Sequence, residues 1–297
     1  MFGKLSVIAT FAATMVAPSA GAQREDTTVN VLAIGRPGMA DVRVTRGLRY
    51  QDTLTMDVYR SPTQARGARR PAVLFVHGGL VARASGASPT TWASYQSWGR
   101  LVAASGFVGV TFNHRLDTDE ELAAPEQQIR SAMSYVRAHA GELDIDPDRL
   151  CLAFYSAGGQ VASAVLRDPQ PFVRCVVLLY PYLDLEHHRR ATPFRGPMTA
   201  AHVDSEVPRY SPAALLARDP SRLPPLFVAM AGRDAIPHLN ESIERFMRAA
   251  LANRVRIDFA LHPTGVHGFD QRDHDERSRE ILESVMTFYR THLSPGH

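Results

Sequence analysis

The chain has 297 residues, of which 45% are hydrophobic and 21% are charged, with a formal net charge of +3. This composition is typical of a globular protein with a sizeable core, and so small a charge gives no argument for a nucleic-acid partner. Lys4 is the only lysine, which excludes a phosphate-binding Walker A loop, a Schiff-base lysine and a Ser-Lys dyad from the rest of the chain.

Residues 1–22 have the pattern of a secretory signal peptide. Lys4 precedes an apolar run from Leu5 to Val16, and small residues at 20–22 form a cleavage site before Gln23. The apolar run is too short to span a bilayer. We therefore expect a secreted or periplasmic protein with no stable membrane anchor after cleavage. An uncleaved anchor and a disordered leader are the alternatives.

The next part of the chain begins with residues 23–40, which show little periodicity and form a lead-in. Alternating apolar residues predict two antiparallel strands, near 41–46 and 49–60. The continuous apolar run at 71–76 is typical of a strand buried on both faces. Strands and helices then alternate. Further strands are expected at 106–113, 149–155, 172–183, 224–234 and 255–263, and helices at 94–105, 124–143, 157–167, 239–253 and 276–293.

Two antiparallel strands followed by repeated strand–helix units predict an α/β fold. We expect a mostly parallel central sheet with helices on both faces, formed by one domain over residues 23–297. Residues 184–222 lie between two expected strands, and this segment is longer than a crossover between two strands needs to be. They are interpreted as a short cap-like insertion over the carboxyl edge of the sheet, with a short helix at 211–217.

Chemically useful side chains follow four of the expected strands. His77, Gly78 and Gly79 follow the strand at 71–76, and Ser156 follows the strand at 149–155. Asp234 and His267 follow the last two strands. In open α/β sheets functional residues gather at these carboxyl ends. The order Ser, Asp, His is also the order of the catalytic triad in α/β hydrolases.

Each of these residues has a predicted chemical role. A serine hydroxyl is a weak nucleophile until a base takes its proton, and His267 is the expected base for Ser156. Asp234 is expected to hold the imidazole tautomer and stabilise the imidazolium. The developing oxyanion needs preorganised donors, and these are assigned to three backbone N–H groups, those of Gly78, Gly79 and Ala157.

Several stretches together resemble the α/β-hydrolase superfamily over about residues 45–293. They are "MDVYRSP", "VLFVHGG", "DIDPDRLCLAFYSAGG" and "HPTGVHGF". The HGG and SAGG motifs are most similar to the secreted carboxylesterase, feruloyl-esterase-like and hormone-sensitive-lipase-like branch. This resemblance implies a serine carboxylic ester hydrolase that acts through a seryl acyl-enzyme on small to medium-sized esters, with no cofactor and no metal. It gives neither the natural substrate nor the oligomeric state.

Two residues depart from the pattern of this superfamily. Leu80 follows the HGG motif, where the family often has a glycine or an aromatic residue. We expect this difference to change a wall of the pocket more than the oxyanion hole. Phe154 stands where the G-x-S-x-G motif has its first glycine. We expect the ring to rotate into the face of the sheet, beside small neighbours such as Ala153 and Ala157, and the serine to react.

Two rival functions stay open from the sequence. A prolyl-oligopeptidase-type exopeptidase shares the hydrolase core, although the residues before 40 cannot supply the β-propeller that such enzymes usually carry. A catalytically inactive hydrolase-fold binding protein is the second rival, and Phe154 is its only support.

Further candidates have weaker sequence signals. His262 competes with His267 as the base, and His267 is preferred for its H-G-F setting. Asp270 is expected to be solvated. His187 and His188 are expected to be exposed in a polar loop and to bind no metal.

The two cysteines, Cys151 and Cys175, each lie early in an expected strand. Free buried thiols are expected, because direct bridges between parallel strands are strained. Export would permit a disulfide, so that alternative stays open.

Overall fold

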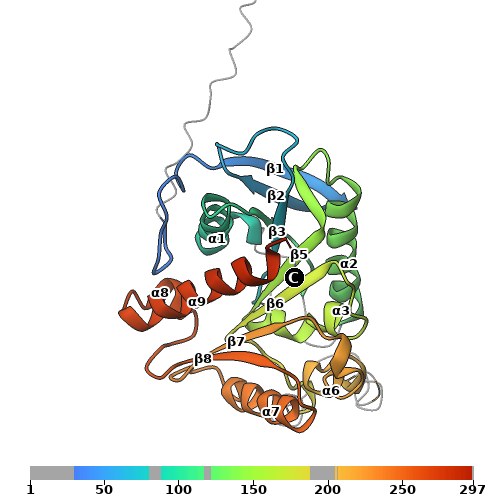
Figure 1. Ribbon diagram of the computed structural model, residues 1–297. Helices are drawn as coiled ribbons and strands as arrows, with labels where there is room; N and C mark the ends of the chain where they lie inside the picture. Colours follow the sequence, from blue (N-terminus) through green and yellow to red (C-terminus); the bar gives the residue numbers. More distant parts are fainter. Residues whose placement is uncertain (1–29, 80–87, 117–121, 188–204, 206, 296–297) are drawn as a thin grey trace, which may run out of the picture.

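A central eight-stranded sheet organises the molecule (Figure 1). The computed structural model describes residues 30–79, 88–116, 122–187, 205 and 207–295. The strand order is β1-β2-β4-β3-β5-β6-β7-β8. Strands β3 to β8 run parallel, and β1 and β2 form an antiparallel edge. The strands are β1 Arg43–Gln51, β2 Leu54–Arg60, β3 Arg70–Val76, β4 Val108–Phe112, β5 Ile145–Tyr155, β6 Val173–Leu179, β7 Leu226–Ala231 and β8 Ile257–His262.

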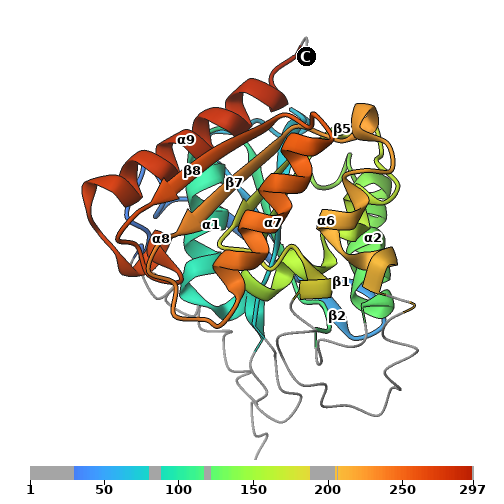
Figure 2. The same ribbon diagram turned by 90° about the horizontal axis from the view of Figure 1, so that it is seen from below.

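Helices cover both faces of this sheet. Figures 1 and 2 show α1, α8 and α9 on one face, and α2, α3, α6 and α7 on the other. The helices are α1 Ala93–Ala104, α2 Ala123–Ala138, α3 Ser163–Leu166, α6 Pro212–Leu215, α7 Leu239–Ala252, α8 Phe269–Arg272 and α9 Glu276–Leu293. Short 3-10 helices occur at Pro89–Thr91, Ser156–Val161 and Pro220–Arg222. The predicted α/β architecture is confirmed.

The core has two halves, one on each face of the sheet. Alternate residues of β5 enter different halves, with Leu152 and Phe154 on the side of α2 and α3, and Ala153 and Tyr155 on the side of α1 and α9. Strands that are buried on both faces carry continuous apolar runs. This burial explains why β3 and β5 could be recognised from the sequence.

The first hairpin differs from the prediction. Its turn lies at Asp52 and Thr53, whereas the sequence pattern had placed it near residue 47. Gly47 instead lies within β1 with φ 67°, at a register shift between Thr45 and Leu48. A glycine inside a strand often marks such a β-bulge rather than a turn.

The helix expected at 157–167 is also different. The chain forms a 3-10 helix over Ser156–Val161 and only then the short α-helix α3. Gly158 and Gly159 have low α-helical propensity. The two glycines therefore account for the weak α-helical character of this segment.

The expectation of two free thiols was wrong. Cys151 and Cys175 are bonded, with a Cα–Cα distance of 4.7 Å that lies inside the range a disulfide can span. The residues are register partners on the neighbouring strands β5 and β6, and their side chains lie on the same face. Both strands were predicted from the sequence, but their alignment was not.

Part of the predicted insertion at 184–222 is described. Helix α6 confirms the short helix expected at 211–217. Residues 188–204 lie outside the described part of the chain, as do Leu80 and the signal segment at 1–22, so the cap and the leader stay predictions. Among the described residues, no helix is long and apolar enough to cross a membrane.

Candidate active site

Ser156 lies at a sharp corner between β5 and the following 3-10 helix. Its φ is 52°, in the left-handed region that residues other than glycine rarely adopt. Such a conformation costs roughly 1–3 kcal/mol and persists only where the surrounding structure holds it. The Ser156 carbonyl oxygen accepts a hydrogen bond of 3.1 Å from the N–H of Tyr182. This strained strand-to-helix turn is the geometry of a nucleophile elbow.

Two glycines allow the backbone to crowd around this corner. A Cβ added to Gly78 would lie 2.3 Å from the Tyr155 carbonyl oxygen and 2.7 Å from Ser156 Cβ. A Cβ added to Gly158 would lie 2.7 Å from the His77 carbonyl oxygen. Contacts this short require glycine at both positions. The close backbone contacts of this corner are therefore made possible by Gly78 and Gly158.

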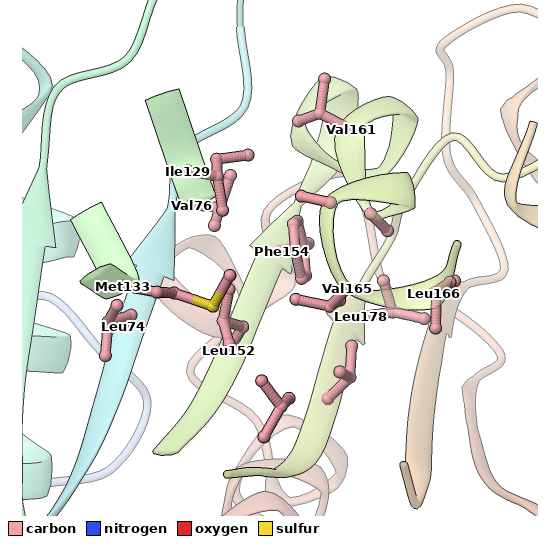
Figure 3. Packing of buried hydrophobic residues seen from close by; sticks show 14 of the residues in the cluster. Leu74, Val76, Ile129, Met133, Leu152, Phe154, Val161, Val165, Leu166 and Leu178 are labelled. Atoms are coloured by element: carbon pink, nitrogen blue, oxygen red, sulfur yellow. The ribbon is translucent and has the colours of Figure 1, made fainter. Parts of the chain in front are cut away.

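Phe154 occupies a different environment. Its side chain is fully buried and points into the half of the core that faces α2 and α3, near Val165 and Leu178 (Figure 3). The expected rotation of the ring into the face of the sheet is confirmed. Ala157 belongs to the same half of the core, as expected, but Ala153 lies on the opposite face and makes no room for the ring.

Asp234 and His267 form a close pair at the carboxyl edge of the sheet. The distance between Asp234 Oδ2 and His267 Nδ1 is 2.6 Å; the Asp234 side chain is fully buried and that of His267 is 23% exposed. The N–H of Ile236 donates to the other oxygen of Asp234 at 2.9 Å, which fixes the carboxylate. The carboxylate accepts the Nδ1 proton, so Nε2 is the nitrogen left to act as a base.

The third member of the predicted triad is not joined to this pair. Among the described residues, a hydrogen bond connects Asp234 to His267 but none connects His267 to Ser156. Catalytic hydrogen bonds are often long without substrate and shorten in the reacting complex. The triad as a working unit therefore stays a prediction.

His262 is engaged elsewhere in the structure. Its side chain is fully buried at the end of β8. Its Nε2 lies 3.1 Å from Asp275 Oδ1 and 3.0 Å from Ser278 Oγ, at the start of α9. This placement ties β8 to α9 and favours His267 as the base.

Asp270 is buried, and the expectation that it would be solvated was wrong. Its carboxylate accepts hydrogen bonds from Trp98 Nε1 at 2.8 Å and from the Tyr180 hydroxyl at 2.7 Å. Burial raises the pKa of this carboxyl group. The Tyr180 ring packs edge-on against the His267 ring, with centroids 4.8 Å apart. This polar network thus packs against the His267 imidazole. The sequence did not reveal it, because Trp98 lies in α1, Tyr180 directly after β6 and Asp270 in α8.

One predicted oxyanion donor is already engaged. The N–H of Gly78 donates to the Tyr95 hydroxyl at 3.0 Å. Gly78 can donate to an oxyanion only after this bond is given up, which the sequence could not indicate. Gly79, with φ 79°, and Ala157, at the start of the 3-10 helix, stay predicted donors.

His77 has structural contacts on both ring nitrogens. Its ring stacks on that of His114 with centroids 3.8 Å apart, and its Nδ1 lies 3.2 Å from the Gly78 carbonyl oxygen. Burial lowers the pKa of His77 to about 4. The ring is therefore neutral at pH 7 and holds the glycine loop in place.

Solved structures share this architecture. A bacterial heroin esterase superposes with a TM-score of 0.66 at 23% identity, covering 85% of this chain and 84% of its own. This chain has the α/β-hydrolase fold. Another structure with the fold is the propionate-bound esterase Est2 of the planctomycete Thermogutta terrifontis, with a TM-score of 0.65 at 22% identity over 88% of this chain and 98% of that one.

Sequence relatives of this α/β-hydrolase-fold protein are also esterases by name. The BD-FAE family model matches residues 56–169. Esterase LipQ of Mycobacterium tuberculosis (strain ATCC 25618 / H37Rv) is 26% identical over 78% of this chain and 58% of its own length. Esterase LipC of the same organism is 24% identical over 68% of this chain and 54% of its own length. The chain thus spans little more than half the length of these curated relatives.

Proposed function

We propose that this protein is a carboxylic ester hydrolase with Ser156 as nucleophile, His267 as base and Asp234 as the acid that orients it. The observation that carries the proposal is the 2.6 Å contact between Asp234 and His267. The pair lies on loops that follow neighbouring parallel strands of the sheet in which β5 ends at the strained Ser156. The esterase names of the relatives and of the structural neighbours support the same reaction class.

The proposed reaction has two halves. Ser156 Oγ attacks the ester carbonyl carbon while His267 Nε2 takes the hydroxyl proton, and Asp234 stabilises the imidazolium through Nδ1. The tetrahedral oxyanion binds the N–H groups of Gly79 and Ala157. Its collapse breaks the bond to the alcohol, which leaves with the proton from His267. A water molecule then attacks the acyl-enzyme with His267 as base and releases the carboxylic acid.

The proposed substrates are small to medium-sized esters. The Trp92 ring lies beside the predicted oxyanion hole, because a Cβ added to Gly79 would be 3.7 Å from it. We assign this ring to a wall of the acyl pocket. Trp98, in contrast, is buried and bonded to Asp270, so it belongs to the core.

A substrate panel separates this function from its rivals. We expect turnover of p-nitrophenyl acetate and butyrate, no turnover of a prolyl p-nitroanilide, and labelling of Ser156 by a fluorophosphonate probe, identified by peptide mass spectrometry. Preference for the anilide would favour the exopeptidase. A folded protein that neither labels nor turns over any ester would favour the inactive binding protein.

We also propose that the protein is exported. The disulfide between Cys151 and Cys175 supports this location, because such bonds persist in oxidising compartments. We expect the mature chain to begin at Gln23, which N-terminal sequencing of the exported product would measure. Recovery of the intact leader in a membrane fraction would contradict cleavage and support an anchor.

A further inference from the structure

Three potential metal ligands meet on the surface, apart from the candidate active site. One ligand atom from each of His187, His238 and Glu241 lies within 4.8 Å of the other two. Glu241 Oε2 is 2.7 Å from His187 Nε2 and 3.1 Å from His238 Nδ1. The two imidazole rings are nearly perpendicular, with centroids 5.7 Å apart. Both rings therefore direct a nitrogen at the same carboxylate oxygen.

Two separate segments bring these side chains together. His238 immediately precedes α7, and Glu241 lies in its first turn, so the two are on one side of the helix. His187 comes from the segment after β6, where its N–H donates to Asp184 Oδ1 at 3.0 Å. That segment begins the predicted insertion at 184–222. An ion bound by all three side chains would join the base of the insertion to the loop that also carries Asp234.

The donor set determines which ion fits. Two imidazole nitrogens and one carboxylate oxygen suit zinc and similar transition metals, whereas magnesium and calcium prefer oxygen ligands throughout. The side chains of His187, His238 and Glu241 are 17%, 36% and 56% exposed, so an ion can enter from solvent. The positive end of the α7 dipole opposes a cation, and the Glu241 carboxylate offsets it.

We propose that His187, His238 and Glu241 form a binding site for one divalent transition-metal ion, with Zn²⁺ as the best match. The ion takes the place of the protons that now lie between the imidazoles and the carboxylate. Three protein ligands leave a fourth tetrahedral position for water. The site uses no residue of the proposed triad, so it stands whether or not the esterase function does.

The test is a metal titration of the chelator-treated, full-length protein. We expect one Zn²⁺ per chain by competition with a chromophoric indicator, and an absorption spectrum typical of tetrahedral nitrogen and oxygen ligation when Co²⁺ is used. His187→Ala, His238→Ala and Glu241→Gln should each weaken Zn²⁺ binding at least tenfold, as expected for loss of one of three ligands. Binding should also weaken from pH 7.5 to pH 5.5, because ligating imidazoles must be deprotonated.

His274→Ala is the matched control. His274 is an exposed histidine beside α8, with Nε2 3.3 Å from the Gln271 carbonyl oxygen, and its removal should leave the affinity unchanged. Circular dichroism verifies that each variant is folded. The proposal is overturned if the wild type binds no Zn²⁺, if the three variants keep wild-type affinity, or if the control loses it. A Co²⁺ spectrum that is unchanged in all three variants would overturn it as well.

Discussion

Ser156→Ala should lower kcat for p-nitrophenyl butyrate by at least about 10,000-fold, because no other group supplies the nucleophile of the proposed acyl-enzyme. The hydroxyl is removed while Cβ is kept, so the strained backbone at φ 52° retains its contact with Gly78. The melting temperature should therefore change little. Steady-state kinetics and a thermal melt of the same preparation measure both effects.

His267→Ala should produce a loss of similar size, since base and nucleophile act as one proton-transfer unit. His262→Ala is the matched comparison: it removes an imidazole of the same chemistry that is bonded to Asp275 and Ser278. That variant should be less stable and yet turn over ester when folded. If His262→Ala abolishes turnover and His267→Ala keeps most of it, the assignment of the base is wrong.

Phe154→Gly should lower the free energy of unfolding by about 3–5 kcal/mol, the usual range when a buried aromatic side chain is truncated. The ring is fully buried between β5 and the helices on the side of α2, and its removal leaves a void (Figure 3). The added backbone freedom of glycine increases the loss somewhat. Because the crowded contacts of the elbow fall at Gly78 and Gly158, fluorophosphonate labelling of the folded variant should match that of the wild type.

Phe259→Gly controls for the backbone effect. Phe259 lies in strand β8 and is 45% exposed, so the same substitution there removes little buried area. Chemical denaturation should show a clearly smaller loss for this variant than for Phe154→Gly. A wild type that never labels, beside a Phe154→Gly variant that labels readily, would mean that the ring distorts the elbow and would support the binding-protein rival.

The features that the sequence predicted correctly depend on short stretches of chain. The run at 71–76 and the strand before Ser156 are apolar because both faces of the sheet are covered, and this pattern can be read locally. Asp234 and His267 were placed on the loops that follow β7 and β8, and Ser156 at the end of β5, by their positions after such strands; their catalytic roles stay predictions. The close contact between Asp234 and His267 follows from the adjacency of β7 and β8.

The features that the sequence missed depend on alignment between distant residues. The disulfide needs Cys151 and Cys175 to be register partners, and a shift of one residue would separate them to opposite faces. Asp270 was assigned to solvent because its partners, Trp98 and Tyr180, come from other elements. His187 was expected to be exposed because it was read together with its neighbour His188. Its side chain is only 17% exposed and contacts Glu241, 54 positions away.

The disulfide also affects the chain before it folds. It closes a loop with a sequence separation of 24 that contains Ser156, Gly158 and α3. Such a link removes conformational freedom from the unfolded ensemble, and for a loop of this size the chain-entropy model gives about 3 kcal/mol. A chain made in a reducing cytosol would fold without this contribution. Ser156, the proposed nucleophile, therefore lies in the segment that the disulfide closes, and the stability of the chain depends on the redox state of the compartment in which it matures.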